Sequence, residues 1–422
     1  MMCGRKIRMV ILLLTAVMIF VSFTGCAPDE PVVEPDAPDV EPDAPDVDEI
    51  VIGHVHPLTG ALALEGNEMR DAVQMAVDEV NEAGGIQSLG GAPVRLLHGD
   101  VEFNPELGAS ETERLIREGA VGILGAYASS IVFTATAIAE REQVPFVVTV
   151  AVADNITERG FKYTFRPQPN AYTMAYYHSE YLKMLNDEYD AGIENILVIH
   201  EESLFGATIS DHLVKFSEEA GLNIVDTISY SAATGDLSTE VDRVLARNPD
   251  IIVHVGYFRD GVLFLNTAND RGVEIPVIAC ASGAMSHPKM PGEVGEYAEG
   301  LLDVNYRDNP ISPESQTMHD RYLEQFGTPM STHAIYAYAA ARVLLEAIEQ
   351  AGSDNPQDIR DALAAMEYQL PILPYLEDST VRFDEKGECA TSRSPMMQVQ
   401  DGEIKVVFPE EVAEAELIWP TN

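Results

Sequence analysis

The chain from Ile50 onward alternates short apolar runs with longer segments in which apolar residues recur at helical spacing. The first run, Ile50–Gly53, is too short and too β-branched to form a helix, so it predicts a strand. Helical periodicity then extends from Met69 to Val80, with Asn67 as the expected N-cap and Gly84 as the left-handed end. The Asn104-Pro105 pair predicts the start of a second helix, because asparagine caps helices and proline suits the first helical position.

The same alternation continues through the rest of the chain. Strands are predicted at 94–97, 121–124, 144–148, 196–199, 224–228, 251–255, 275–279, 381–384 and 404–408. Helices are predicted at 131–142, 171–186, 207–220, 237–247, 261–271, 314–326, 332–350 and 357–366. Strands that alternate with helices indicate an α/β fold with parallel sheets, in which the loops at the strand ends gather at one edge. That edge is where a ligand is expected.

The N-terminal residues have the pattern of a signal peptide. Three basic residues precede an apolar run, Met9–Val21, that is shorter than a spanning helix requires. The run ends in Phe23-Thr24-Gly25-Cys26, which resembles the lipobox of bacterial lipoproteins, so residues 1–25 are predicted to be removed and Cys26 to be lipid-modified. The alternative is ordinary secretion with Cys26 an incidental thiol.

Residues 26–49 predict a tether between the lipidated cysteine and the folded part. The sequence EPDAPDV occurs at 34–40 and again at 41–47. Proline and carboxylates cannot bury apolar area, so this segment should be extended and solvated. It would hold a lipid-anchored domain clear of the membrane.

Charge and cysteine content exclude several classes of protein. The formal net charge of −43 makes phosphate backbones poor partners, so nucleic acid binding is not expected. Two of the four cysteines, Cys280 and Cys389, lie beyond the N-terminal segment, which is too few for a disulfide framework. One bridge between them and two buried free thiols are the two alternatives.

The loop Gly125–Ser130 is the most informative candidate for ligand binding. It joins a predicted strand to a predicted helix, so its N–H groups and the hydroxyls of Ser129 and Ser130 would face a ligand at a helix N-terminus. Such a terminus favours a carboxylate. The alternative is that one serine only caps the helix, and both roles can coexist on neighbouring serines. A second loop, Thr149–Gly160, should lie beside the first.

These segments resemble a known family. IVIGHVHPLTGALALEGNEMRDAVQMAVDEVNEAGGI at 50–86, GAYASS at 125–130, and VPFVV with ITERGFKYTFRPQP are similar to the type I periplasmic solute-binding proteins of branched-chain amino acid ABC importers. The resemblance implies two Rossmann-like lobes joined by a three-segment hinge, which close on a small solute and deliver it to permease and ATPase subunits. The expected lobes are 50–168 with 300–374, and 169–299 with 375–422.

The resemblance also implies roles for particular residues. Ser129 would bind the carboxylate of the solute, and the carbonyl of Ala151 would accept from its ammonium group. Tyr127 and Tyr257 would line the pocket from the first and second lobes. Phe205 stands where a tyrosine is common, so it would keep the aromatic wall without the hydroxyl.

Three residues depart from the family pattern at the expected binding site. Ala153 replaces a threonine, Glu65 replaces a frequent aromatic residue, and Ser282 replaces the acid that pairs with the ammonium. A desolvated ammonium without a carboxylate partner is costly. Either Glu65 or Asp154 supplies the charge, or the solute is not an α-amino acid. The expected solute is small and carboxylate-bearing or amino-acid-like.

Catalysis is not expected, because the sequence has no GxSxG, HExxH or GxxxxGK motif. His54 and His56 have metal-like spacing but no evident third ligand, and Ser286-His287-Pro288-Lys289 is interpreted as a loop. No cofactor is predicted, and the protein is expected to be an extracytoplasmic monomer. The alternatives to transport are a ligand-sensing subunit that acts through a separate membrane partner and, with less support, an enzyme.

Overall fold

The computed structural model describes residues 47–373, 377–389 and 392–420. The predicted signal peptide, the lipidation at Cys26 and nearly all of the predicted tether therefore lie outside the described residues. Within the part of the chain that is described, no helix combines the length and the apolar character needed to cross a membrane.

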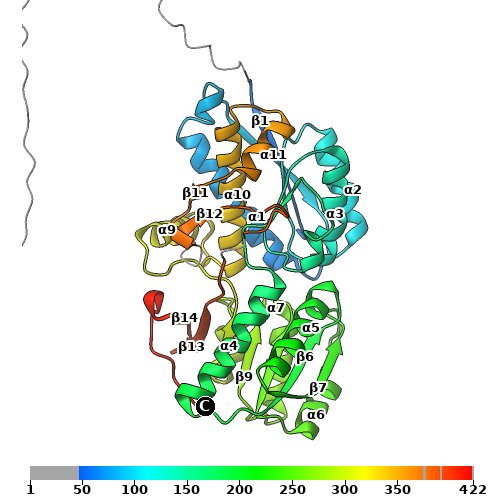
Figure 1. Ribbon diagram of the computed structural model, residues 1–422, viewed down its shortest axis with the longest axis vertical. Coiled ribbons are helices and arrows are strands. Elements are labelled where there is room, and N and C mark those ends of the chain that lie inside the picture. The colour runs from blue at the N-terminus through cyan, green and yellow to red at the C-terminus, as the bar shows by residue number, and fades with distance from the viewer. Residues whose placement is uncertain (1–46, 374–376, 390–391, 421–422) are drawn as a thin grey trace, which may run out of the picture. The chain divides into compact units, whose positions relative to one another are not determined.

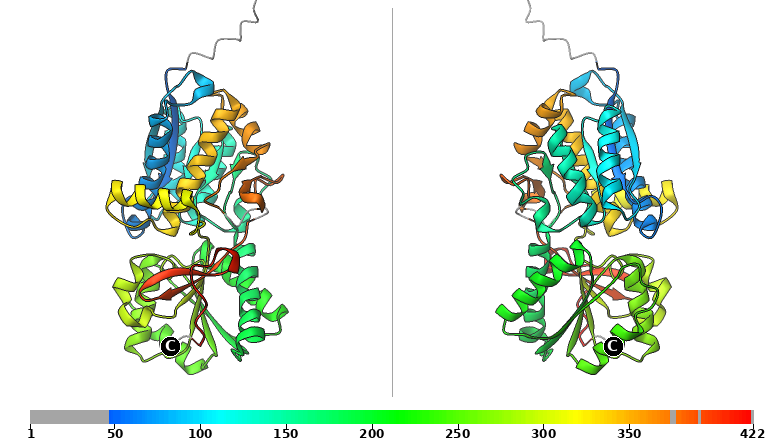
Figure 2. Two further views of the ribbon diagram at one scale, coloured as in Figure 1. Left: turned by 90° about the vertical axis from the view of Figure 1, so that its left-hand side faces the viewer. Right: turned by 90° about the vertical axis from the view of Figure 1, so that its right-hand side faces the viewer.

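The first lobe is built on a five-stranded sheet in which every strand is parallel to its neighbour, with strand order β2-β1-β3-β4-β5. Its strands are β1 (Ile50–His56), β2 (Val94–Asp100), β3 (Ile123–Gly125), β4 (Phe146–Val148) and β5 (Thr164–Phe165). The helices are α1 (Ala63–Glu82), α2 (Pro105–Arg117), α3 (Ser129–Glu142), α10 (Thr332–Ala351) and α11 (Pro356–Ala364). In Figure 1, α2 and α3 lie side by side, and α1 packs against α10, as the side views of Figure 2 also show.

The second lobe is built on a seven-stranded sheet with strand order β14-β13-β10-β9-β8-β6-β7. The strands that are parallel to one another are β6 (Asn195–Glu201), β7 (Asn223–Tyr230), β8 (Ile251–Val255), β9 (Val277–Cys280) and β10 (Leu302–Val304). β13 (Met396–Gln400) pairs antiparallel with β10 and with the edge strand β14 (Glu403–Phe408). The helices are α4 (Ala171–Tyr189), α5 (Leu204–Glu219), α6 (Ser238–Arg247), α7 (Phe258–Asp270) and α8 (Met290–Val294). The predicted α/β class with two lobes is confirmed.

Helix capping follows the sequence at one predicted position and departs from it at another. Asn104 caps α2, and its Oδ1 accepts from the N–H of Glu106 at 2.8 Å. The prediction for Asn67 is wrong, because α1 begins at Ala63, four residues earlier. Asn67 lies inside the helix, where its Nδ2 donates to the carbonyl of Leu58 at 3.0 Å and so fastens the preceding loop.

The return from the second lobe to the first comes later than the sequence suggests. We expected the crossing near Gly300, but β10 follows this glycine and pairs with β9 and β13 in the seven-stranded sheet. The crossing therefore follows Val304 and leads into α9 (Pro313–Phe326). The strand predicted at 381–384 does not join the second lobe either, because β12 (Thr380–Val381) pairs with β11 (Tyr368–Gln369) in a separate two-stranded sheet.

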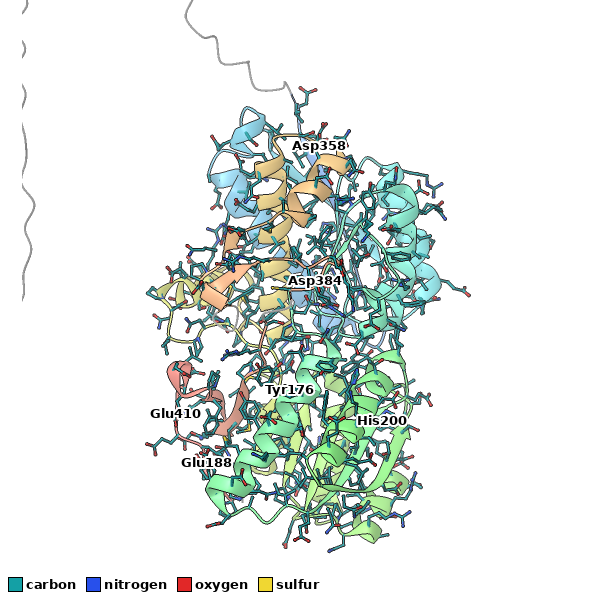
Figure 3. The ribbon with its side chains drawn as sticks, in the orientation of Figure 1. Tyr176, Glu188, His200, Asp358, Asp384 and Glu410 are labelled. Carbon is teal, nitrogen blue, oxygen red and sulfur yellow. The ribbon has the colours of Figure 1, made fainter. Side chains whose placement is uncertain are left out.

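The tyrosines of α4 are less buried than the sequence suggests. Helical spacing from Tyr172 to Met184 favours core positions, and Met174 and Leu182 are indeed fully buried. Tyr172 and Tyr176 are instead 47% and 40% exposed, and Tyr176 projects from the outer side of α4 in Figure 3. Both rings make edge contacts with Phe216 of α5. They cover a neighbouring helix rather than fill the core.

Candidate ligand-binding site

A narrow cavity of about 20 Å³, room for about one water molecule, lies where loops at the carboxyl ends of strands from both sheets meet. This is the preferred position for a ligand in α/β proteins. Its wall consists of aromatic rings, small apolar side chains, one serine and one histidine: Tyr127, Ser129, Val150, Ala151, Val152, Phe205, Tyr257, Ala281, Tyr306 and His333.

The structure brings five of the predicted site residues together at this wall and places the other five elsewhere. Those at the wall are Tyr127, Ser129, Ala151, Phe205 and Tyr257. Those that do not line the cavity are Glu65, Ser130, Ala153, Asp154 and Ser282. The sequence did not single out Tyr306, Ala281 or His333, which the chain supplies from segments beyond residue 280.

Ser129 is the first residue of α3 and presents its hydroxyl to the cavity. The N-cap is Ala128, so neither Ser129 nor Ser130 caps the helix. The Oγ of Ser129 accepts from the N–H of Ala153 at 3.3 Å, which joins the two ligand loops predicted to lie side by side. With an acceptor position of its oxygen used in this way, the hydroxyl proton of Ser129 is available to a guest.

Aromatic rings from both lobes meet at Tyr257. Its ring centroid lies 5.3 Å from that of Tyr127, 5.2 Å from that of Phe205 and 5.6 Å from that of Phe103. These are ordinary distances for aromatic pairs, which stabilise the wall beyond the area they bury. Gly283 leaves room for the side chain of Tyr127, because a Cβ at this position would lie only 2.5 Å from the hydroxyl of Tyr127.

His333 lines the cavity and has one ring nitrogen without a hydrogen-bond partner. Its Nε2 lies 3.2 Å from the hydroxyl of Tyr127, while its Nδ1 has no hydrogen-bond partner. The side chain is 2% exposed, and burial, together with the nearby His287, lowers the pKa of His333 to about 3. The imidazole is therefore neutral at physiological pH, and its Nδ1 calls for a partner that a guest could supply.

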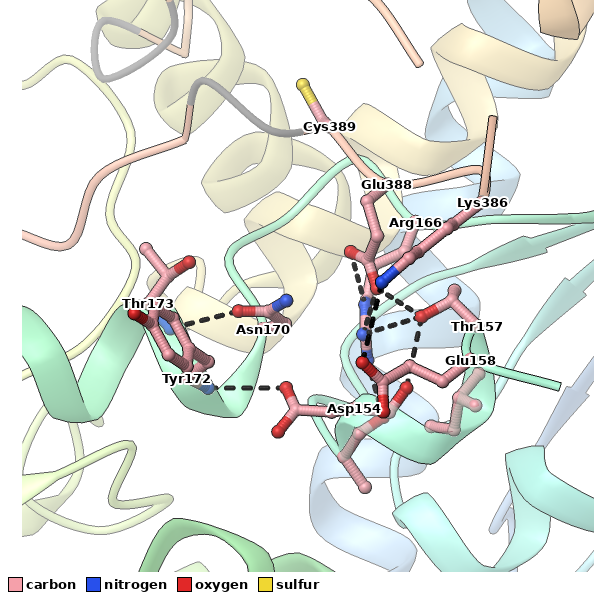
Figure 4. Close-up of polar contacts among 12 residues, drawn as sticks. Asp154, Thr157, Glu158, Arg166, Asn170, Tyr172, Thr173, Lys386, Glu388 and Cys389 are labelled. Atoms are coloured by element: carbon pink, nitrogen blue, oxygen red, sulfur yellow. Dashed lines mark hydrogen bonds and ion pairs between the residues drawn. The ribbon is translucent and has the colours of Figure 1, made fainter. Parts of the chain in front are cut away.

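Behind the cavity, a buried ion pair connects the hinge to the loop that carries Ala151. Arg166 is fully buried and pairs with Glu388, which lies in another crossing segment; its Nε is 3.0 Å from Oε2, and its Nη2 contacts Oε1. Figure 4 shows both side chains together with Thr157. Nη1 of Arg166 donates to the carbonyls of Ala151 at 3.3 Å and Ala153 at 2.9 Å.

The main chain reinforces this connection between crossing segments. The N–H of Arg166 donates to the carbonyl of Gly387 at 2.7 Å, and the N–H of Cys389 donates to the carbonyl of Arg166 at 3.0 Å. Cys280 and Cys389 are both buried and are not joined in a disulfide, so the predicted alternative of a bridge between them is wrong.

Asp154 lies in a second, more polar depression instead of the cavity wall. Its Oδ2 is 2.5 Å from Nε2 of His212, and its Oδ1 accepts from the N–H of Tyr172 at 3.3 Å. The same depression is lined by Lys386 and Glu388. Asp154 therefore pairs the first lobe with α5 of the second lobe.

Glu65 and Glu68 connect α1 to loops of the second lobe. Oε1 of Glu65 accepts from the N–H of Phe258 at 3.4 Å, and the carboxylate of Glu68 lies 3.0 Å from Nε2 of His287 and 2.9 Å from Nζ of Lys289. Burial raises the pKa of Glu65 to about 7. Burial acts in the same direction on Glu68, but the hydrogen bonds from His287 and Lys289 outweigh it and lower the pKa of Glu68 to about 2.

Ser282 organises a turn rather than facing the cavity. Its Oγ accepts from the N–H of Ala284 at 3.2 Å, and its own N–H donates to Oδ1 of Asp303 at 3.4 Å. Asp303 also accepts from Nδ2 of Asn305 at 3.1 Å, and burial raises the pKa of Asp303 to about 7. The segment Ser286–Lys289 is a loop, as predicted, and its histidine and lysine hydrogen-bond to the carboxylate of Glu68.

A third histidine joins the predicted His54 and His56 pair. His54 Nδ1 is 2.9 Å from His56 Nδ1, and His54 Nε2 is 2.5 Å from His98 Nδ1. The three rings hydrogen-bond in a row instead of converging on one point. Among the described side chains, no group of three or more His, Cys, Asp or Glu residues is arranged to hold a metal ion.

The raised pKa of Glu65 predicts that the free energy of unfolding depends on pH. Its ordinary pKa is 4.5 and its folded pKa is about 7, so the folded state binds the extra proton and loses stability as pH rises between these values. Glu65→Gln removes the titrating group, so its free energy of unfolding at pH 8 should exceed that of the wild type by about 1–3 kcal/mol. At pH 4.5 the two proteins should agree. Urea denaturation across this range tests the prediction, and a gap that does not vary with pH would contradict it.

The site and the fold together define a solute-binding protein with two α/β lobes. Residues 49–403 match the family described as periplasmic binding protein, and the chain belongs to this family. The resemblance seen in the sequence is thereby confirmed.

Curated relatives cover nearly the whole chain. The Leu/Ile/Val-binding protein homolog 7 of Brucella suis biovar 1 is 31% identical over 388 residues, which is 88% of this chain and 94% of the relative. Homolog 8 of Brucella abortus is 30% identical over 382 residues, or 87% and 93% of the two chains.

Solved structures share the fold at lower identity. The branched-chain amino acid transporter substrate-binding protein LivJ of Streptococcus pneumoniae, solved with isoleucine, has a TM-score of 0.74 and 21% identity, covering 89% of this chain and 100% of that one. A solute-binding protein of an ABC transporter from Rhodopseudomonas palustris BisB5, solved with 3,4-dihydroxybenzoic acid, has a TM-score of 0.73 and 18% identity, covering 85% and 95%.

Proposed function

We propose that the protein is the extracytoplasmic receptor of an ABC importer and binds a small carboxylate-bearing or amino-acid-like solute in the cavity around Ser129. The main observation behind this proposal is that the hydroxyl of Ser129, the N-terminal end of α3 and aromatic side chains from both lobes all lie around one cavity. A helix N-terminus and a hydroxyl donor favour an anionic group. The aromatic wall suits the apolar part of such a solute.

The comparisons support this proposal without fixing the solute. Curated relatives carry the name Leu/Ile/Val-binding protein homolog, while proteins of the same fold have been solved with isoleucine and with 3,4-dihydroxybenzoic acid. All of these compounds bear a carboxylate. The partners in transport would be permease and ATPase subunits, and the protein would release its solute to them unchanged, as a receptor rather than an enzyme.

Closure of two lobes about a hinge would complete the site. The proposed lobes keep 50–168 and 169–299, but the return to the first lobe follows Val304, because β10 belongs to the second sheet, and the last crossing follows β12, which pairs with β11 outside that sheet. Closing such lobes excludes water and strengthens each polar contact with the guest. The contacts of Glu65, Glu68 and Asp154 with the second lobe would form when the lobes close.

We place the protein on the outer face of the cell membrane, held there through Cys26 as a monomer. Residues 1–25 would be the signal peptide and 26–49 the tether. The mass of the protein extracted from membranes tests the anchor, because diacyl modification at Cys26 adds several hundred daltons to the chain that begins there. An unmodified soluble chain would refute the anchor and leave the receptor proposal standing.

Ser129 and Ser130 offer a matched pair of variants for the binding proposal. Ser129→Ala should weaken solute binding by about 1.5–3 kcal/mol, the range for a hydrogen bond to a charged group, which corresponds to roughly ten- to hundredfold in Kd. Ser130→Ala should leave Kd unchanged, because Ser130 does not line the cavity. Thermal-shift screening of amino acids, amides, carboxylates and nucleosides would first supply the solute.

Calorimetric titration of both serine variants with that solute then gives the two Kd values. Equal Kd values for Ser129→Ala and the wild type would place the binding site elsewhere.

A further inference from the structure

The carbonyl of Ala151, the predicted acceptor for a solute ammonium, already has two donors. Nη1 of Arg166 and Nε2 of Gln168 each lie 3.3 Å from this oxygen. A carbonyl oxygen has two lone pairs, so these donors occupy its acceptor positions. Both donors are fully buried, and one is a permanent cation held by Glu388. An ammonium group brought to this oxygen would displace a donor and meet like charge.

The cavity wall offers an ammonium no carboxylate. None of the described residues that line the cavity is Asp, Glu, Lys or Arg. Carboxyl groups beyond this wall are committed to protein partners. Asp260 accepts from the hydroxyl of Tyr230 at 2.6 Å and from the N–H of Tyr257 at 3.2 Å, while Glu68 pairs with His287 and Lys289.

Glu201 also lies near the aromatic wall, where its carboxylate accepts from the N–H groups of Ser203 at 2.7 Å and Gly206 at 2.6 Å. Glu65 is another acid near this wall. Its carboxyl is turned toward the N–H of Phe258, and it is 2% exposed. Burial raises the pKa of Glu65 to about 7, so a large share of this group is neutral at physiological pH. A partly protonated carboxyl outside the wall is a poor counter-ion for a desolvated ammonium.

The groups that do face the cavity suit an anion and an apolar body. The hydroxyl of Ser129 is free to donate, and it stands at the N-terminus of a 14-residue helix. The rings of Tyr127, Phe205, Tyr257 and Tyr306 surround the remaining space. His333 also lines this wall, and Nδ1 of its neutral, buried ring has no hydrogen-bond partner.

We propose that the solute is a carboxylate with an aromatic or branched hydrocarbon body and no ammonium group. This inference rests on the proposed receptor function and narrows its solute class. The carboxylate binds at Ser129 and the first turn of α3, and the body lies among the aromatic rings. A hydroxyl on the body would satisfy Nδ1 of His333. An α-amino acid with the same carbon skeleton would bind more weakly, because its ammonium group would lose its hydration without gaining a counter-ion.

Ligand pairs that differ only in the ammonium group test the inference. The pairs are 4-methylpentanoate with L-leucine and 3-phenylpropanoate with L-phenylalanine, with benzoate and 4-hydroxybenzoate as aromatic carboxylates. We expect at least one carboxylate without an ammonium group to raise the thermal midpoint, and it should bind at least tenfold tighter than its amino acid in calorimetric titration. Tighter or equal binding of the amino acid would overturn the inference.

Gln168→Leu provides an independent arm, because it frees one lone pair of the Ala151 carbonyl and removes an amide whose Oε1 is unpartnered. The preference for the carboxylate over its amino acid should fall severalfold in this variant, and an unchanged preference would count against the role of the occupied carbonyl.

The same screen separates this inference from the receptor proposal. Binding of an amide, nucleoside or amino acid in preference to every carboxylate overturns the solute class and leaves a receptor at this site, provided that Ser129→Ala weakens that binding. If no compound of the whole library shifts the thermal midpoint, the receptor proposal fails and the inference falls with it.

Discussion

Arg166→Met is expected to lower the free energy of unfolding by about 3–5 kcal/mol, the cost of breaking a buried ion pair by removing one partner. Arg166 is fully buried and Glu388 is 8% exposed, so the substitution leaves a largely buried carboxylate without its counter-ion. It also removes the donor to the carbonyls of Ala151 and Ala153. Urea denaturation followed by circular dichroism measures the change.

Two controls separate charge burial from a general loss of packing. The double variant Arg166→Met with Glu388→Leu should recover much of the loss, because apolar residues often replace both partners of a buried pair at little cost. Arg95→Met removes the exposed partner of Glu49 and should leave the urea midpoint unchanged, because exposed pairs contribute little. A midpoint for Arg166→Met equal to that of the wild type would show that the pair does not stabilise the hinge.

The alternation of strands and helices made most of the fold predictable. The run Ile251–Val255 coincides with a strand end to end, because a strand covered on both faces is nearly continuously apolar, and its one polar residue, His254, is buried. Short strands at the hinge were harder to predict from the sequence. β10 has three residues, and its membership in the second sheet depends on pairing with β9 and β13, which no local pattern encodes.

Loops near the strand ends made half of the candidate site predictable. Ser129 and Ala151 follow strands of the same parallel sheet, so the topology brings them to one edge. Tyr306 and His333 come from the return crossing and from the first turn of α10, and their approach depends on packing between distant segments. Arg166 carried one signal, because it is a charged residue that directly follows the short buried strand β5 and precedes a proline. Its partner, Glu388, lies 222 residues away, and no feature of the sequence around Glu388 indicated the pairing.

Tyr257→Ala is expected to lower both the stability of the protein and its affinity for the solute. Tyr257 is 2% exposed and contacts Tyr127, Phe103 and Phe205, so truncation leaves a void where rings from both lobes meet. Buried aromatic-to-alanine changes cost about 3–5 kcal/mol of unfolding free energy. Affinity should fall at least tenfold, because the ring supplies wall from the second lobe and only the closed state uses it.

Tyr257→Phe is the matched control for the ring itself. It removes only the hydroxyl, whose contact with Oγ of Ser203 is a long 3.5 Å, so stability should fall by less than about 1 kcal/mol. Calorimetric titration at a temperature where circular dichroism shows both variants fully folded separates affinity from stability. An alanine variant that is destabilised but keeps the wild-type Kd would mean that Tyr257 is core alone and that the solute binds outside this cavity. A phenylalanine variant with the affinity of the alanine variant would instead move the role of Tyr257 from its ring to its hydroxyl.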